Sequence, residues 1–409
     1  MGLFSGSKTF KSLENRDFRL FFFAQMFSLM GTGMQATAQS WLLWKMTGSE
    51  TLLGILGFAQ MGPVLVFGIC GGLIADRLPR KRLVISTQAL ALVQAGLMTF
   101  LAYSGMITPT YIILLAGFLG IINAFDMTAR QTFLGDMVGM KDVGNAIALN
   151  SVLFNTARIV APPIAGVIVS SYGEGLCFAL NAASFLLVLA ALIMIRARGE
   201  AAKNSSSVIS SLREAVDFIR GDAASFRLLL LLVVTSLMLL PYGYFLPYFA
   251  DTVLGGKARM FGFLISSVGS GALTGALIVA RNRKVSRMPM LMGLFSFLLG
   301  VDMLLFSFSK TPFISIPLLF FGGLCTMFIA SSSNIFLQTS APEHLRGRVV
   351  SFYVTAFVGI PPLGGFFMGS FAENYGTPAV LIWCAIFTSA VSAFYLFTLK
   401  KPADQPPGL

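Results

Sequence analysis

Charged residues are concentrated in one short stretch of the chain, between two long apolar segments. Asp76 and Arg77 lie just before Pro79, and Arg80 and Lys81 follow it directly. Proline cannot continue a helix, so the stretch is expected to form a turn between two helices. An acid among several bases can form ion pairs that are made and broken as neighbouring helices move, and we expect this turn to be a charged, water-facing hairpin.

Three other charged residues lie within apolar segments, where an ionisable group is costly and commonly functional. Asp126 and Asp302 are candidate proton sites, and Asp302 has a packed polar residue as its alternative interpretation. Arg158 could bind an anionic group through its two-pronged guanidinium. Its alternative is a structural charge that is satisfied by carbonyls or by an acid.

Uncharged polar residues recur at helical spacing in other apolar segments. One stripe could line a cavity or hold helices together by hydrogen bonds, and its members are Gln25, Ser28, Thr32, Gln35 and Gln39. A second group could form a cavity wall or an interfacial aromatic belt, and it consists of Tyr242, Tyr244 and Tyr248. Asn334 is a further candidate for the cavity, with Gln338 beside it.

The composition indicates an all-α membrane protein. The 409 residues are 56% hydrophobic and 11% charged, with a mean hydropathy of +0.80, whereas soluble domains carry about 25% charged residues. A span needs about 20 apolar residues. The sequence predicts twelve spans, at about 18–44, 51–75, 83–104, 109–129, 143–170, 175–196, 226–250, 259–280, 288–309, 312–338, 348–371 and 377–398.

A long polar interruption divides these spans into two groups. We expect an N-terminal bundle of six helices over 1–196, a linker over 197–225 and a C-terminal bundle of six helices over 226–409. Within the linker, apolar residues from Val208 to Ile219 recur at helical spacing, which predicts an amphipathic helix on the membrane surface.

Lysine and arginine fall mainly in alternate loops, as the positive-inside rule describes. Only Lys45, Lys257, Arg259 and Lys310 lie in the other set of loops. This predicts that both termini are cytoplasmic in a multi-pass protein of a bacterial inner membrane. The net charge of +12 is spread over these loops, so we expect no nucleic-acid partner.

Several kinds of chemistry lack the residues they need. The single histidine cannot build a zinc site or a serine-histidine-aspartate triad, and the four cysteines share no metal-ligand spacing. The chain has no phosphate-binding loop of the GxxxxGK type. We therefore expect no enzyme, no metal and no cofactor.

Two proline pairs show that the halves of the chain resemble each other. Ala161-Pro162-Pro163 with Gly166 lies in the fifth predicted span, and Pro361-Pro362 with Gly365 lies in the eleventh. Small residues allow close helix contact and proline bends a span. Such a repeat predicts two parallel six-span halves related by an axis along the membrane normal.

The hairpin spacing Gly72-x-x-x-Asp76-x-x-x-Arg80 resembles the loop between spans two and three of the major facilitator superfamily. The resemblance implies that Asp76, Arg80 and Asp126 form a charge network that latches the two halves together. The span-five motif resembles that of the exporters of this superfamily, although Ala157, Ala161 and Ala165 replace the usual glycines. An arginine before the proline pair resembles the branch that includes the enterobactin exporter.

The expected function is proton-coupled export of an amphipathic small molecule, siderophore-like or drug-like, by a monomer in a lipid bilayer. Substrate would bind near the midplane while the halves rock around it. Uptake or facilitated diffusion of a metabolite is the alternative within transport. A flippase-like protein that moves lipid between leaflets is an alternative of another class, and a transport-dead scaffold or sensor is a third.

Overall fold

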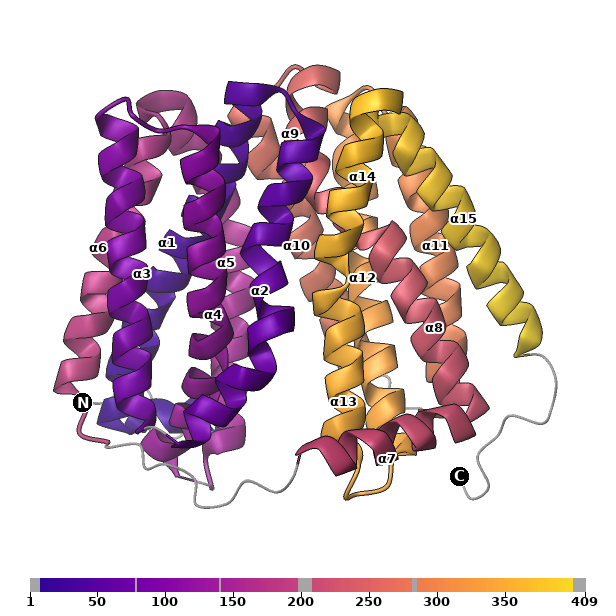
Figure 1. Cartoon of the computed structure of the whole chain (residues 1–409), viewed down its shortest axis with the longest axis horizontal. Helices are drawn as coiled ribbons and strands as arrows, with labels where there is room; N and C mark the ends of the chain where they lie inside the picture. The colour runs from indigo at the N-terminus through magenta and orange to yellow at the C-terminus, as the bar shows by residue number, and fades with distance from the viewer. Residues whose placement is uncertain (1–7, 78, 140, 198–207, 282–284, 400–409) are drawn as a thin grey trace. The chain divides into compact units, whose positions relative to one another are not determined.

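The computed structural model describes residues 8–77, 79–139, 141–197, 208–281 and 285–399, with only the backbone described for 8–10, 68–77, 208–213 and 286. No strand occurs within these ranges (Figure 1). The contacts divide the chain into two compact units. Unit 1 comprises Met1–Thr47 and Ala59–Ser205, and unit 2 comprises Gly48–Phe58 and Ser206–Leu409.

Unit 1 is built from long helices. They are η1 (Lys8–Glu14), α1 (Arg16–Thr47), most of α2 (Glu50–Arg77), α3 (Arg80–Tyr103), α4 (Pro109–Val138), α5 (Val143–Tyr172) and α6 (Glu174–Met194). Local sequence sets their ends: the Thr108 hydroxyl accepts a hydrogen bond from the Tyr111 amide at the start of α4, and Pro109 suits a first turn. Gly139 ends α4 with a φ of 75°, which favours glycine.

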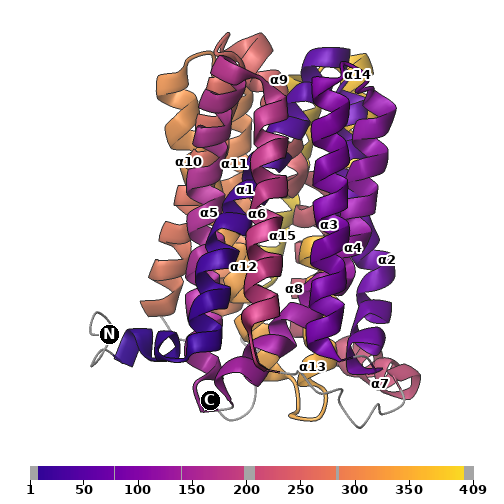
Figure 2. The same cartoon turned by 90° about the vertical axis from the view of Figure 1, so that its left-hand side faces the viewer.

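Within unit 1, α1 packs against α4, α5 and α6, and α3 packs against α4 and α6. Figure 2 shows α1, α5 and α6 side by side. Small residues let α5 approach α1: a Cβ added at Gly33 would lie 2.8 Å from the Cβ of Ala161. Close backbone approach of this kind replaces the hydrophobic driving force that lipid does not provide.

Unit 2 contains the helices α7 (Val208–Gly221), α8 (Ala223–Met238), η2 (Leu240–Phe245), α9 (Leu246–Tyr248), η3 (Phe249–Val253), α10 (Lys257–Arg281), η4 (Val285–Arg287), α11 (Met288–Phe308), α12 (Pro312–Ser340), α13 (Arg346–Val354), η5 (Thr355–Gly359), α14 (Pro361–Tyr375) and α15 (Thr377–Thr398). Here α12 packs against α10 and α11, and α11 packs against α15. The α10–α12 contact depends on glycine, because a Cβ at Gly275 would lie 2.9 Å from the Leu324 carbonyl oxygen.

Eleven helices within the described ranges are long and apolar enough to cross a membrane. Helix α1 is not among these eleven, but its 32 residues extend about 48 Å at about 1.5 Å per residue, which is ample for a span. Its polar stripe makes it less apolar than the others. The predicted set of twelve spans agrees with these helices once α1 is included.

Proline has different effects in three of the spans that contain it. Pro241 and Pro247 break the seventh span into α8, η2, α9 and η3, as their positions predict. In α5, Pro162 and Pro163 lie within a continuous helix. Before Pro361 the helix widens into a π-turn, in which the Ile360 amide donates to the Thr355 carbonyl at 3.1 Å.

The predicted amphipathic helix is present as α7, and it packs against α8 and α13 of unit 2 (Figure 1). Ala215 and Ile219 on its apolar face are buried. His344, in the α12–α13 connection, lies 3.2 Å from Glu214 of α7. The apolar face of α7 is therefore at least partly covered by protein.

Candidate functional site

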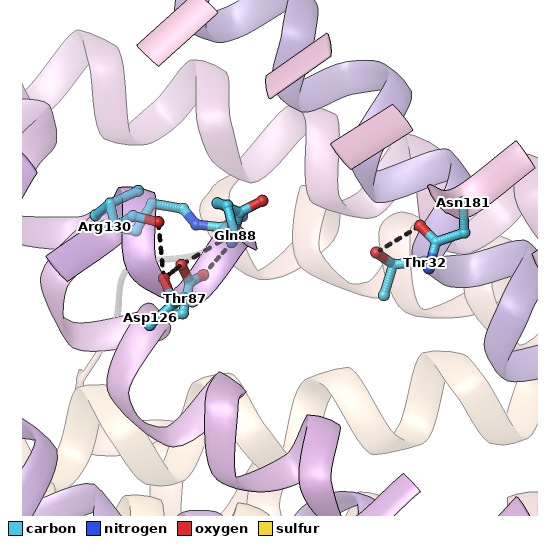
Figure 3. A network of polar contacts seen from close by, with 7 residues as sticks. Thr32, Thr87, Gln88, Asp126, Arg130 and Asn181 are labelled. Carbon is cyan, nitrogen blue, oxygen red and sulfur yellow. Dashed lines mark hydrogen bonds and ion pairs between the residues drawn. The ribbon is translucent and has the colours of Figure 1, made fainter. Parts of the chain in front are cut away.

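Asp126 is the centre of a buried polar network between α3 and α4 (Figure 3). Its side chain accepts hydrogen bonds from Thr87 at 2.7 Å and from Gln88 at 3.0 Å, both on Oδ1. Arg130, one turn further along α4, pairs with its other oxygen. The carboxyl group thus has three donors, one of which is the Arg130 guanidinium. Asp126 is only 3% exposed, so the network is closed within unit 1.

Arg80 pairs with Asp136, which differs from the Arg80–Asp126 contact that the family resemblance implies. The Arg80 Nη1 lies 2.9 Å and 3.2 Å from the two oxygens of Asp136. Asp126 and Asp136 are separated by about 15 Å along α4, so one residue at the start of α3 cannot reach both. The side chains of Gly72, Asp76 and Arg77 lie outside the described residues, and Lys81 donates to the Ile195 carbonyl at 2.5 Å.

The N-terminal segment contacts the ends of several helices near Arg80. Lys11 pairs with Asp142 at 2.8 Å, and Asn15 donates to the Met137 carbonyl at 2.7 Å. Asp17 accepts hydrogen bonds from the backbone amides of Arg196 and Ala197. The hydrogen bond from Lys11 to Asp142 is the main cause that raises the Lys11 pKa. These contacts were not predicted, because η1 looks like an ordinary polar N-terminus.

The polar stripe of α1 holds helices of unit 1 together. Gln35 donates to Gln94 at 3.0 Å and accepts from Asn181 at 2.8 Å, while Asn181 accepts from Thr32 at 3.4 Å (Figure 3). Gln39 donates to the Ile112 carbonyl at 2.9 Å. These hydrogen bonds are what the alternative interpretation of this stripe expects, and the lining of a cavity by the stripe stays a prediction. Both remaining members are buried as well, namely Gln25 and Ser28.

Arg158 differs from the other charged residues of unit 1. It lies near the middle of α5 and is exposed, while Ala157 and Ala161 beside it are buried. Pro162 and Gly166 belong to the same buried face, and Pro163 is half-buried. Among the described residues, none forms an ion pair or a hydrogen bond with the guanidinium. The guanidinium is thus exposed on α5.

The tyrosines of the seventh span contact neighbouring residues of unit 2, and their role in a cavity wall stays a prediction. Tyr242 is 4% exposed, and Tyr248 makes an edge-to-face contact with Phe249. The Tyr244 ring lies against two glycines: a Cβ at Gly57 or at Gly365 would come within 2.7 Å or 2.6 Å of it. Gly365 therefore serves close packing in unit 2, with Pro361 and Pro362 buried before it on α14.

A groove with a cavity volume of about 490 Å³ lies between α10 and α12. Aromatic rings and serine hydroxyls line it together, from Phe263, Ser266, Ser267, Ser270, Ile316, Pro317 and Phe320. Asn334 lies further along α12, half-buried, and accepts a hydrogen bond from the exposed Gln338 at 2.7 Å. The groove is uncharged and amphipathic, and sequence reasoning did not identify it.

Asp302 of α11 is the other acid at membrane level. It is 2% exposed, and neither of its carboxylate oxygens has a hydrogen-bond partner among the described residues. Its environment is therefore the opposite of the environment of Asp126. No group of three or more metal-ligating side chains occurs in the described part of the chain.

Comparison with known proteins gives consistent matches along the chain. A family model described as transmembrane secretion effector matches residues 7–406. The staphyloferrin A transporter of Staphylococcus aureus is 24% identical over 389 residues, covering 93% of this chain and 96% of that protein. The multidrug efflux pump Tap of Mycolicibacterium fortuitum is 27% identical, with 89% and 91% covered. Macrolide efflux protein A of Streptococcus pyogenes is 21% identical, with 86% and 88% covered.

Solved structures of transporters share the fold. A bacterial homologue of the human lysosomal transporter Spinster, in an inward-facing unoccupied conformation, aligns with a TM-score of 0.71 and 14% identity. It covers 96% of this chain and 97% of that one. A POT family transporter in complex with a thioalcohol-conjugated peptide aligns with a TM-score of 0.76 and 12% identity, with 96% and 99% covered. At these identities the likeness describes the fold alone.

Proposed function

The chain belongs to the transmembrane secretion effector family of the major facilitator superfamily, and we propose that it exports an amphipathic small molecule that carries an acidic group. Export would proceed by alternating access, with the substrate bound near the midplane. The placement of lysine and arginine favours cytoplasmic termini in a bacterial inner membrane. We propose further that the protein acts as a monomer and exchanges substrate for protons.

Arg158 is the observation that carries this proposal. An arginine in mid-span is costly unless it faces a partner or a watery cavity. Because the described residues supply no partner, a watery path is the environment that suits the exposed guanidinium. A carboxylate or similar anion could bind its two-pronged donor edge.

The names of the relatives support the proposed kind of substrate. The relatives are named for staphyloferrin A, for multiple drugs and for macrolides, and we propose a small-molecule substrate of the same kind. A siderophore-like molecule would be such a compound and would also carry the acidic group that Arg158 could bind.

The ion pair at one end of unit 1 would hold the start of α3 against the end of α4 during the transport cycle, and we call this contact the latch. Arg80 and Asp136 are partly buried, so their ion pair is screened less than one on an open surface. We propose that Asp76 joins this latch, together with Gly72 and Arg77 near the end of α2 and Lys81 near the start of α3. The Asp126–Arg130 network would keep α3 and α4 rigid beneath it.

The experiment compares Arg158→Gln and Arg158→Lys with the parent protein in proteoliposomes. Staphyloferrin A serves as the anionic probe and the macrolide erythromycin as the probe without a carboxylate. Loss of one charge-assisted hydrogen bond costs about 1.5–3 kcal/mol. We therefore expect Arg158→Gln to weaken staphyloferrin A transport about tenfold or more and to leave erythromycin transport nearly unchanged, with partial recovery in Arg158→Lys.

The matched control is Gln131→Asn, which exchanges one neutral polar side chain for another at an exposed position of α4. An equal loss for both probes in Arg158→Gln, together with reduced protein yield, would assign a structural role to the arginine. Transport of neither probe by the parent protein would count against this substrate class.

A further inference from the structure

Asp302 is a buried acid for which the proposed function has given no role. The chain has two acids at membrane level in the two units. Asp126 accepts hydrogen bonds from Thr87, Gln88 and Arg130, whereas both oxygens of Asp302 are buried and without a partner in the described part of the chain. The two carboxyl groups are therefore held in opposite environments.

The carboxyl of Asp302 faces the α11–α12 contact. A Cβ added at Gly322 of α12 would lie 2.9 Å from Asp302 Oδ2 and 2.9 Å from the Met303 methyl group. The hydroxyl of Thr326, one turn further along α12, donates to the Gly322 carbonyl. Because residue 322 has no side chain, the carboxyl fits against the α12 backbone with no donor aimed at it.

The helices α12 and α15, which pack against α11, offer no countercharge. Apart from Asp302, the sequences of α11, α12 and α15 contain no acidic or basic residue. Their titratable groups are Cys325 on α12 and Cys384 and Tyr395 on α15. The remaining charges on packed elements are Arg227, near the start of α8, and Arg287 of η4, which is about 22 Å from Asp302 along α11.

An ionised carboxylate that is buried without a partner is far more costly than the neutral acid. The neutral form is therefore the one that fits this site. We propose that Asp302 is a proton-binding site of the transport cycle, holding its proton while α11 and α12 are packed together. When water reaches the carboxyl during the cycle, the O–H bond breaks, and the proton leaves as hydronium while the carboxylate keeps the electron pair.

This inference rests on the proposed function only where it places the proton in a transport cycle. The bound proton itself can be observed without a substrate. Infrared difference spectra of the purified full-length protein, recorded against pH, report the C=O stretch of a protonated carboxyl group. We expect a band at neutral pH that disappears in Asp302→Asn and persists in Asp126→Asn. If the parent protein and Asp302→Asn give the same spectra in this region, the proposal fails.

A second variant keeps the spectroscopic test decisive if Asp302→Asn does not fold. Gly322→Ala places a methyl group against the carboxyl and should shift or remove the same band. An unchanged band in that variant would place the protonated group elsewhere and overturn the assignment.

Transport supplies the other half of the test, with erythromycin and staphyloferrin A as probes in proteoliposomes. We expect Asp302→Asn to retain probe exchange at equal pH and to lose accumulation driven by a pH gradient. The control Asp217→Asn changes an exposed acid of α7 and should keep both activities. Gradient-driven accumulation that survives in Asp302→Asn would exclude this proton from the cycle. Failure of the parent protein to exchange either probe would count against the proposed substrates, and the infrared result would be unaffected.

Discussion

Arg80 at the start of α3 binds both carboxylate oxygens of Asp136 near the end of α4, at 2.9 Å and 3.2 Å from a single Nη1. The contact joins the charged hairpin to α4, two segments that the sequence separates widely. Since the Arg80 and Asp136 side chains are 19% and 23% exposed, this pair is the best-defined part of the proposed latch.

Arg80→Ala should slow transport and lower stability. Loss of a hydrogen-bonded, partly buried charge pair costs about 1–3 kcal/mol, and Asp136→Asn should produce a similar effect. The measurement is probe exchange in proteoliposomes together with thermal unfolding in detergent. The control is Arg82→Ala, because Arg82 is exposed; parent-like exchange in Arg80→Ala would remove the latch from the mechanism.

Asn181→Ala should destabilise unit 1, because Asn181 donates to Gln35 and accepts from Thr32. A buried polar group left without a partner costs about 1–3 kcal/mol. Thermal unfolding of Asn181→Ala should therefore show a clearly lower midpoint than that of Asn155→Ala, whose amide is exposed. Equal midpoints in the two variants would mean that the amide network contributes no stability.

Gly365→Ala should disturb the packing around Tyr244, since the new methyl carbon would lie 2.6 Å from the ring. Overpacking of this kind costs about 1–3 kcal/mol, measured by thermal unfolding. The control Gly243→Ala has no atom within 4 Å of the added carbon and should be close to neutral. In a double-mutant cycle, Tyr244→Leu should reduce the cost of Gly365→Ala; a cost independent of residue 244 would refute the contact.

The Lys11–Asp142 pair predicts a dependence on alkaline pH. The hydrogen bond to Asp142 raises the Lys11 pKa above its ordinary value of 10.5, so the pair stabilises the folded state below that pH and the stabilisation is lost as pH rises through the folded-state value. Lys11→Met should lower the unfolding midpoint slightly at pH 8, and the difference should shrink above pH 10.5. A difference that stays constant with pH would show that the ammonium charge is not involved.

The helices of the chain were predictable because long apolar segments and proline positions determine them. The broken seventh span followed from Pro241 and Pro247, and α7 followed from its apolar spacing between Val208 and Ile219. Helix α4 shows the limit of this reasoning. Its apolar segment ends near residue 129, but the helix continues to Val138 through polar residues, which brings Asp136 rather than Asp126 to Arg80.

The site was less predictable because spacing gives the face of a helix but not what covers that face. Gln35 and Gln39 have the periodicity of a cavity wall, yet their partners are Gln94, Asn181 and a backbone carbonyl. Arg158 and Asp302 were identified from charge alone. The groove between α10 and α12 depends on how two helices converge, and no local pattern encodes that convergence.

The most direct test of the central claim is substrate movement in inside-out vesicles that contain the overproduced protein. With an acidic interior and a neutral medium, an exporter that exchanges substrate for protons should accumulate staphyloferrin A inside the vesicles above its outside concentration, and a proton uncoupler should abolish that accumulation. Accumulation that occurs only in right-side-out vesicles, or that is insensitive to the uncoupler, would contradict proton-coupled export.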